Sequence, residues 1–256
     1  KVIAITGSCG KTSLKELLGN IFGKIGKVSY SPKSYNNKYG VPLSIFNINK
    51  HDDFNIFEIG MDKKGEIDFL SKIIKPDVGV ITNISYAHAK NFKNLNQIAD
   101  AKSEIINNIN SNGSIVLNAD DIFFKKHKKI ALKKNLKIYS FSLRKPNTNV
   151  CIKKIIKLKN KYKILINVNK KQKIFFIKSI FESNLKNMLA ALAVLSIFKN
   201  VNKLNQNIFY NFSNLKGRGD ISKIKIKRKV IKLIDESYNA NPLSVYSAIN
   251  NFNLIK

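Results

Sequence analysis

Short apolar runs alternate with stretches of helical periodicity through roughly the first 140 residues of the chain. The apolar runs, which predict strands, lie at residues 1–5, 55–59, 78–81 and 114–117. The helical stretches that follow them lie at residues 13–25, 66–74 and 95–108. Strands that alternate with helices are typical of βαβ units. We therefore expect an α/β fold with a mainly parallel sheet flanked by helices.

A different pattern follows at residues 149–181, where lysine-rich segments of alternating polarity replace the βα alternation. These segments are CIKKIIKL, YKILINV and KIFFIKSIF. Alternation with a period of two predicts strands with one exposed face, so we expect a small antiparallel β region that is an insertion or an edge of the sheet. Residues 184–199 predict a helix, and because apolar residues occupy more than one of its faces, we expect it to be buried.

The pattern restarts after residue 214 with a glycine turn at residues 217–219 and an alternating stretch that reaches residue 229. A continuous apolar run at residues 230–234 predicts a strand of the buried type, and a helix is expected from residue 243. We interpret this restart as a domain boundary. It divides the chain into a first domain, residues 1–213, and the truncated start of a second α/β domain, residues 214–256.

The composition is that of a globular protein, since 44% of the 256 residues are hydrophobic and 24% are charged. Forty-six Lys and Arg against 16 Asp and Glu give a formal net charge of +30. Taken alone, that charge would indicate a nucleic acid or an anionic membrane as partner. The basic residues are spread along the whole chain among many Asn and Ile, which favours a genome-wide compositional bias. We therefore expect no nucleic-acid partner, although the charge favours polyanionic ligands such as nucleotides.

The cysteines and the apolar runs bear on the cellular compartment. Cys9 and Cys151 are far apart and form no CxxC motif, so we expect neither a zinc site nor a disulfide framework, and a reducing, cytoplasmic location. No apolar run reaches the roughly 18 residues of a membrane span, so we expect no membrane insertion. Because the chain begins with Lys1 and directly with a predicted strand, we interpret it as a fragment of a longer protein.

The sequence TGSCGKTS at residues 6–13 lies between a predicted strand and a predicted helix, which is the context of a phosphate-binding loop. Gly7 and Gly10 allow the backbone N–H groups to turn inward, and Lys11 can reach the terminal phosphates. Thr12 can ligate Mg²⁺. The predicted nucleotide cradle is completed by Ser8, Cys9 and Ser13. A tight strand-to-helix turn that binds no ligand is the alternative.

This loop has the spacing GxxGKT and not GxxxxGK[ST], and in this it resembles the ATP loop of the Mur ligases and the folylpolyglutamate synthetases. Further blocks follow in the order of that superfamily: SYNNKYGVP at residues 34–42, FEIGMDKKGEI at 57–67, VITNISYAH at 80–88, then IADAKSEI, LNADD and DESYNANP. Within the Mur ligase family, DESYNANP favours the MurF type. The resemblance covers the central ATP-binding domain and the start of the C-terminal domain.

The resemblance implies an ATP-dependent ligase that adds D-alanyl-D-alanine to UDP-N-acetylmuramoyl-tripeptide through an acyl phosphate, in peptidoglycan precursor synthesis. It implies a cytoplasmic monomer that uses ATP and two Mg²⁺ ions. One alternative is another ligase of the superfamily, such as the diaminopimelate-adding Mur enzyme or a folylpolyglutamate synthetase, against which DESYNANP argues. The other is a nucleotide-binding or nucleic-acid-binding module without ligase activity.

Three side chains beside Thr12 are expected to hold the metal ions. Glu58 ends a predicted parallel strand, where α/β sheets place their ligands, and its alternative is a structural ion pair. The resemblance implies metal ligation for His88 as well, and for Lys102 as a carbamate, although the sequence alone would place Lys102 on the surface. A carbamate forms from the neutral amine, so a lowered pKa of Lys102 would assist it. Lys11 and Arg218 complete the implied catalytic set.

The resemblance also implies the nucleotide contacts. Asn83 would order the loop near the phosphates, with a strand-end cap as the alternative. Asn184 would contact the adenine, although Ser183 replaces the family's usual histidine; here N-capping of the helix is the alternative. Arg218 would reach the γ-phosphate. The remaining implied contacts are Asp235 on the ribose and Tyr238 and Asn239 along the nucleotide. Because Arg218 and Asp235 lie beyond the predicted boundary, we expect closure of two domains to assemble the site.

Overall fold

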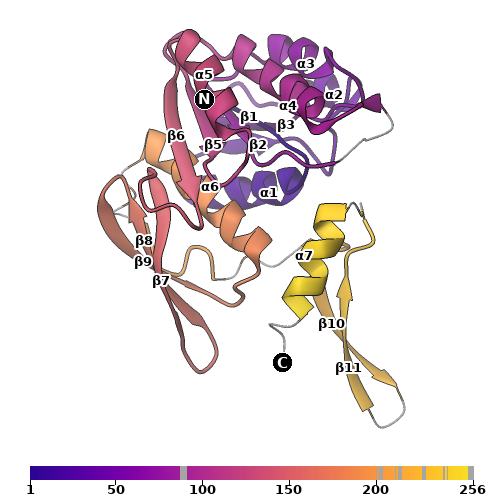
Figure 1. Cartoon of the computed structure of the whole chain (residues 1–256), viewed down its shortest axis with the longest axis vertical. Helices are drawn as coiled ribbons and strands as arrows, with labels where there is room; N and C mark the ends of the chain where they lie inside the picture. Colours follow the sequence, from indigo (N-terminus) through magenta and orange to yellow (C-terminus); the bar gives the residue numbers. More distant parts are fainter. Residues whose placement is uncertain are drawn as a thin grey trace.

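The computed structural model of the chain describes residues 1–86, 91–199, 201, 204–210, 212, 215–226, 229–238, 240 and 242–252. Its main sheet has the strand order β2-β3-β1-β4-β5-β6-β7-β8-β9 (Figure 1). Neighbouring strands from β2 to β7 pair in parallel. The strands before β7 are β1 (Val2–Thr6), β2 (Val28–Tyr30), β3 (Phe54–Glu58), β4 (Val78–Ile81), β5 (Ser114–Asn118) and β6 (Lys137–Ser142). The expected α/β fold with a mainly parallel sheet is confirmed.

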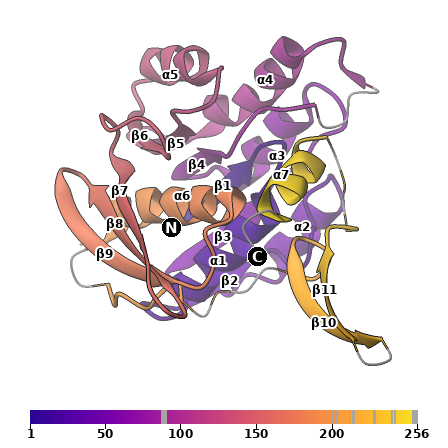
Figure 2. The ribbon, with the colours of Figure 1, turned by 60° about the horizontal axis from the view of Figure 1, so that its bottom comes forward.

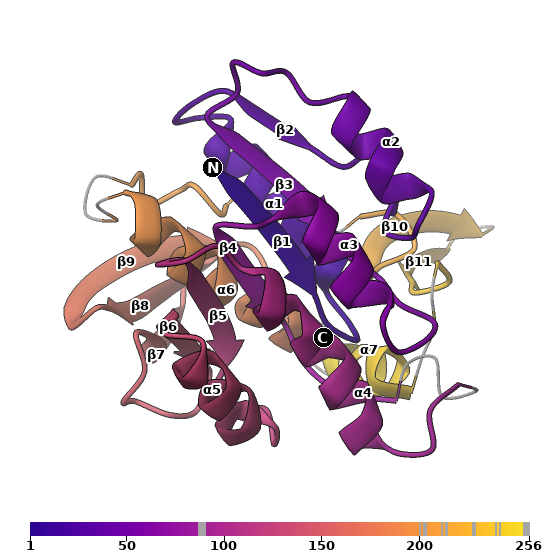
Figure 3. The same ribbon diagram turned by 90° about the horizontal axis from the view of Figure 1, so that it is seen from above.

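Helices cover both faces of this sheet, as Figure 3 shows from above. On one face lie α1 (Lys11–Phe22) and α6 (Glu182–Phe198), whose apolar side chains pack with those of β1, β3 and β5. On the other face lie α2 (Gly40–Phe46), α3 (Glu66–Ile74), α4 (Leu95–Ser103) and α5 (Phe124–Lys133), with a 3₁₀ turn (Glu104–Asn108) after α4. The sheet is therefore buried on both sides, which agrees with the continuous apolar runs of its central strands.

Helix α6 is buried, as its apolar residues on several faces predicted. Leu189, Ala191 and Leu192 have no exposed surface, and the helix packs against α1 and against β5, β6 and β7 (Figure 2). The alternative that Ser183 or Asn184 caps the N-terminus of this helix was wrong. α6 begins at Glu182, and its N-cap residue is Phe181. Both residues lie in the first turn, at the end of the helix that faces the phosphate loop.

The lysine-rich segment forms β7 (Val150–Lys157), β8 (Tyr162–Val168) and β9 (Lys171–Ile177), which pair antiparallel. β7 also pairs in parallel with β6, so the meander continues the main sheet as its edge and is no separate layer. Ile164 and Ile166 of β8 are fully buried in the core that contains α6, whereas Lys163, Leu165 and Asn167, which alternate with them, are partly exposed. The alternation of the sequence thus follows the two faces of the strands.

After residue 215 the chain forms an antiparallel hairpin, β10 (Asp220–Ile226) and β11 (Lys229–Asp235), followed by α7 (Pro242–Phe252). In Figure 1 this unit, in yellow, lies at the lower right of the body formed by the main sheet and its helices. The expectation of a buried strand at residues 230–234 was wrong, because Val230 and Leu233 are exposed. β11 pairs only with β10 among the described residues, and its apolar residues Val230, Ile231 and Leu233 are left exposed.

In the part of the chain that the structure describes, no helix combines the length and apolarity needed to cross a bilayer. Elements that the hydrophobic pattern did not predict are β2, α2, α5 and β6.

Candidate functional site

The phosphate loop connects the end of β1 at Thr6 with the start of α1 at Lys11. Both glycines of the loop have positive φ angles, 142° at Gly7 and 82° at Gly10, which residues other than glycine rarely adopt. A Cβ at Gly7 would also collide with the side chain of Thr82. The loop therefore needs both glycines, and it leaves the N-terminal N–H groups of α1 directed at a ligand position, where a partial positive charge favours anions.

The residues after β4 hold this loop in place. The Asn83 side chain accepts a hydrogen bond from the backbone N–H of Cys9 at 3.0 Å and donates one to the Cys9 carbonyl at 3.0 Å. Thr82 Oγ1 donates to the same carbonyl at 2.7 Å, and the Ser8 hydroxyl donates to the Ser85 carbonyl at 2.9 Å. Asn83 thus contacts the backbone of the loop itself.

Glu58 ends β3, next to β1, and its side chain is almost completely buried, with 1% of the residue exposed. Its Oε1 accepts a hydrogen bond from the Asn36 amide at 2.7 Å. Its Oε2 is buried and has no hydrogen-bond partner among the described residues. A buried carboxylate oxygen without a partner is costly unless a ligand satisfies it, so this atom fits a cation that the structure does not contain.

The donor set around that oxygen suits Mg²⁺ in particular. Thr12 supplies a hydroxyl oxygen and Glu58 a carboxylate oxygen, both on the wall of one cavity. Mg²⁺ prefers one or two protein oxygens together with substrate phosphates and water. Zinc sites are typically built from three or four His, Cys, Asp or Glu side chains. Among the described residues, no group of three or more such side chains is placed to hold a metal ion.

Two lysines near the loop have perturbed acidities. Lys11 Nζ donates to the Gly7 carbonyl at 2.9 Å and lies near the Ser8 carbonyl at 3.4 Å. Burial lowers the pKa of Lys11, and this outweighs the opposing charges of Glu58 and Cys9; the charge of Arg218 lowers it slightly further. Lys102 of α4 is 1% exposed, so the surface location that the sequence alone indicated was wrong. Burial, and secondarily the charge of Lys11, hold the pKa of Lys102 well below its usual value.

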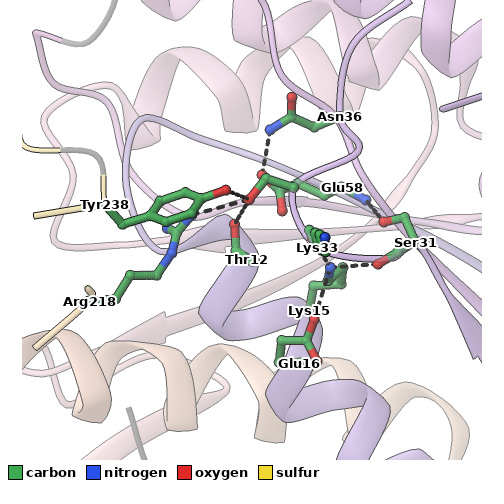
Figure 4. A network of polar contacts seen from close by, with 10 residues as sticks. Thr12, Lys15, Glu16, Ser31, Lys33, Asn36, Glu58, Arg218 and Tyr238 are labelled. Atoms are coloured by element: carbon green, nitrogen blue, oxygen red, sulfur yellow. Dashed lines mark hydrogen bonds and ion pairs between the residues drawn. The ribbon is translucent and has the colours of Figure 1, made fainter. Parts of the chain in front are cut away.

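A serine after β2 connects the phosphate loop with the C-terminal part of the chain (Figure 4). The Ser34 hydroxyl lies 3.4 Å from Thr12 Oγ1 and accepts hydrogen bonds from Arg218 at 3.3 Å and from the Tyr238 hydroxyl at 3.1 Å. The Arg218 guanidinium also stacks on the Tyr238 ring, 4.4 Å from its centroid. Residues about 200 positions apart in the sequence therefore meet at the start of α1.

These groups line one cavity of about 790 Å³. The predicted site residues on its wall are Ser8, Cys9, Gly10, Lys11, Thr12, Ser13, Glu58, Asn83, Asn184, Arg218 and Tyr238. Gly7 shapes the loop behind the wall, and Lys102 lies close enough to Lys11 for their charges to interact. His88 and Asn239 lie outside the described residues.

Asp235 is not on the cavity wall, and its neighbour Glu236 is. The Asp235 carboxylate accepts a hydrogen bond from the Ser237 N–H at 2.9 Å, and the hydrogen bonds from Ser237 lower its pKa. The cavity is also lined by Ser34, Asn36 and Asn187, which the sequence pattern did not single out. Ser34 and Asn36 belong to the block SYNNKYGVP, so the signal for them was present at the level of the motif although no role had been given to either residue.

Comparison with known proteins points to one family. Residues 5–195 match the Mur ligase middle domain. The chain is 33% identical over 249 residues to the UDP-N-acetylmuramoyl-tripeptide--D-alanyl-D-alanine ligase of Buchnera aphidicola, covering 97% of this chain and 53% of the relative. It is also 33% identical to the enzyme of the same name from Rickettsia prowazekii, with 97% and 55% covered. The chain thus spans about half the length of these relatives.

Solved structures agree. The fold superposes on MurF from Acinetobacter baumannii with a TM-score of 0.89 and 29% identity, over 100% of this chain and 55% of that one. It superposes on the MurF ligase from Thermotoga maritima in complex with ADP with a TM-score of 0.85 and 25% identity, over 98% and 56% of the two chains.

Proposed function

This chain belongs to the Mur ligase family, of which it contains the middle domain, and on that premise we propose that it is the ATP-binding part of a MurF-type ligase. The reaction joins D-alanyl-D-alanine to UDP-N-acetylmuramoyl-tripeptide, in the synthesis of peptidoglycan precursors. The relatives that match 97% of the chain carry this activity in their names. We further propose that the enzyme acts as a cytoplasmic monomer, in the compartment that supplies ATP.

The observation that carries the proposal is the combination of a glycine phosphate loop with a buried, partnerless carboxylate oxygen in the same cavity. The loop offers backbone N–H groups and Lys11 to phosphates. Glu58 offers a buried carboxylate oxygen that a bound cation would satisfy. Together these groups favour a nucleoside triphosphate with Mg²⁺ over a simple anion or a nucleic-acid backbone.

The chain's residues orient the reacting groups. The loop N–H groups and Lys11 hold the phosphates of ATP, and Arg218 reaches the same region from the C-terminal part. An oxygen of the tripeptide carboxylate attacks the γ-phosphorus, the bond to the bridging oxygen of ADP breaks, and an acyl phosphate forms. The amine of D-alanyl-D-alanine then attacks the acyl carbon, the amide forms, and phosphate leaves with the carboxylate oxygen. The contribution of the protein is mainly positioning and charge neutralisation.

Mg²⁺, held by Thr12 and Glu58, would supply neutralisation of the charge that develops on the phosphoryl oxygens. We propose that Lys102 contributes to a second ion as a carbamate. Its buried amine has a strongly lowered pKa, which favours the neutral form that combines with CO₂. His88 remains a proposed ligand of that second ion on the basis of the motif VITNISYAH alone.

The proposed division into residues 1–213 and 214–256 gives Arg218 a role in closure. Arg218 and Tyr238 both hydrogen-bond to Ser34 beside the phosphate loop, so a movement of the C-terminal part would bring the guanidinium to the γ-phosphate or withdraw it. Replacing Arg218 by alanine should therefore lower turnover far more than it weakens ATP binding. An equal loss of turnover and of ATP affinity in this variant would contradict the proposed closure of the two domains.

The experiment that tests the function is ADP release by the full-length gene product. UDP-N-acetylmuramoyl-tripeptide and D-alanyl-D-alanine are added singly and together, with Lys11→Ala as the inactive control. We expect ADP only when both substrates are present. A protein that binds Mg²⁺ and ATP but is not stimulated by the pair would contradict the D-alanyl-D-alanine assignment.

A further inference from the structure

Lys15 lies one turn after the phosphate loop on α1, and its side chain is completely buried. Its ammonium donates to the Ser31 carbonyl at 2.6 Å and to the Lys33 carbonyl, and it forms an ion pair with Glu16 at 3.0 Å. An ammonium has three N–H donors, and these partners occupy all of them. A buried charge is costly to keep, so a lysine with two of its three partners on one short backbone segment requires an explanation.

The segment that Lys15 holds is Ser31–Asn36, between β2 and α2, which we call the bridging segment. Lys33 in this segment has a left-handed φ of 46°, a conformation that is unfavourable for a residue with a side chain. Lys15 donates its two backbone hydrogen bonds to the carbonyl of Lys33 itself and to that of Ser31, two residues earlier. The ammonium thus fixes a backbone turn that the local sequence would not favour alone.

The bridging segment in turn contacts the proposed metal-binding residues and Arg218 (Figure 4). Asn36 donates to Glu58 Oε1 at 2.7 Å, and the Ser31 hydroxyl accepts from the Glu58 backbone N–H at 3.2 Å. Ser34 contacts Thr12 and Arg218. The Asn36 contact leaves Glu58 Oε2 as the oxygen without a partner.

We propose that Lys15 is a positioning residue for the Mg²⁺ site: it fixes the bridging segment, and through Asn36 and Ser34 that segment orients Glu58 and Thr12. This inference rests on the proposed function, because it assumes that Glu58 and Thr12 hold the metal of a nucleotide. It assigns a functional consequence to a lysine that touches neither nucleotide nor metal. Partners that orient metal ligands commonly affect metal affinity by 10- to 100-fold, which sets the expected scale.

The test is the gain in ADP affinity that Mg²⁺ produces, measured by calorimetry on this chain with Mg²⁺ and with EDTA. In Lys15→Met, which removes the ammonium and retains an unbranched side chain, we expect the Mg²⁺-dependent gain to fall about tenfold while affinity in EDTA stays within about twofold. The control is Lys126→Met, which removes a helical lysine that is ion-paired with Asp100 at 2.6 Å on the other face of the sheet. It should leave the gain unchanged.

A double-mutant cycle separates positioning from mere loss of stability. If Lys15 acts through the bridging segment, Lys15→Met should add little to the loss already caused by Asn36→Ala, and the double variant should stay within about twofold of the worse single variant. Losses that multiply would overturn the proposal. So would a Lys15→Met variant that melts at a lower temperature but keeps the full Mg²⁺-dependent gain, because that is the result of a purely structural role.

Lys15→Gln covers the case in which Lys15→Met does not fold. Its amide keeps N–H donors on a shorter side chain, so we expect a smaller loss of the gain, about threefold, as when a single hydrogen bond is lost. A gain equal to that of wild type in Lys15→Gln would overturn the proposal. If wild-type chain shows no Mg²⁺-dependent gain at all, the proposed function fails and this inference fails with it; a gain present in wild type and unchanged in the variants refutes the role of Lys15 alone.

Discussion

Replacing Asn83 by alanine is expected to weaken ADP binding without unfolding the protein. The Asn83 side chain makes two hydrogen bonds with the backbone of Cys9, both at 3.0 Å, and it is half-exposed. Thr82 Oγ1 continues to donate to the Cys9 carbonyl at 2.7 Å in the variant. The carbonyl therefore keeps a partner, and the Cys9 N–H loses the acceptor that fixes its direction.

The magnitude follows from those two bonds. Each neutral hydrogen bond contributes about 0.5–1.5 kcal/mol net, so the variant loses about 1–3 kcal/mol of loop organisation. If ADP binding requires the organised loop, this free energy must be supplied on binding, and the ADP affinity falls by roughly 5- to 150-fold. Because the two bonds are only partly buried, the melting temperature should fall by only a few degrees.

The assay is calorimetric titration of the chain with ADP in excess Mg²⁺. Asn110→Ala is the matched control, because the Asn110 amide also makes two bonds of 3.0 Å, to the Lys75 carbonyl and to Asp77, at the opposite end of β4. The control should bind ADP like wild type. An Asn83→Ala variant that binds ADP within twofold of wild type, or a control that loses as much affinity, would refute the reasoning.

Two further predictions concern the loop glycine and the buried lysine. Gly10→Ala places a Cβ at φ 82° and 3.0 Å from Asn187 Oδ1, whereas Gly65→Ala has φ 91° and open space. Both should lose about 1–2 kcal/mol of stability, measured by denaturant unfolding, but only Gly10→Ala should lose ADP affinity. Lys102→Met should raise the melting temperature at pH 7 in bicarbonate-free buffer. The pKa of Lys102 is lowered in the folded state, so between that lowered pKa and 10.5 the unfolded chain binds more protons than the folded chain. The stability of the wild type therefore rises with pH over this range. The difference in melting temperature between Lys102→Met and wild type should accordingly shrink towards pH 10.5. An advantage of Lys102→Met that does not change with pH would contradict the lowered pKa of Lys102.

Much of the fold follows from the hydrophobic pattern because its central strands are buried on both faces. β4 and α3 have the predicted bounds, since their apolar residues begin and end abruptly. The missed elements have weak patterns: β2 is a three-residue edge strand, and α5, with the sequence FKKHKKIALK, buries only His127 and Ala131. For the strand at residues 230–234, by contrast, the apolar pattern predicted burial that the structure does not show. An apolar run does not reveal whether anything covers it.

For the site, residues in the phosphate loop and at strand ends could be predicted, because sequence order alone places the ends of parallel strands at one edge of the sheet. Contacts between distant segments could not. Nothing in the sequence indicates that the Ser34 hydroxyl meets Arg218 and Tyr238, or that Lys15 is buried among 46 basic residues that are mostly exposed. The block IADAKSEI singled out Lys102 as a metal ligand through the resemblance, but its charge and periodicity indicated the surface, and only the structure shows that it is buried.

The central claim, that ATP activates a carboxylate at the γ-phosphate, is tested most directly by following one oxygen atom. UDP-N-acetylmuramoyl-tripeptide labelled with ¹⁸O in its terminal carboxylate is incubated with ATP, Mg²⁺, D-alanyl-D-alanine and the full-length enzyme, and the released phosphate is analysed by mass spectrometry. The account predicts one ¹⁸O atom per phosphate, because the carboxylate oxygen that attacks the γ-phosphorus leaves with it. Unlabelled phosphate, or release of AMP and pyrophosphate in place of ADP, would contradict the account.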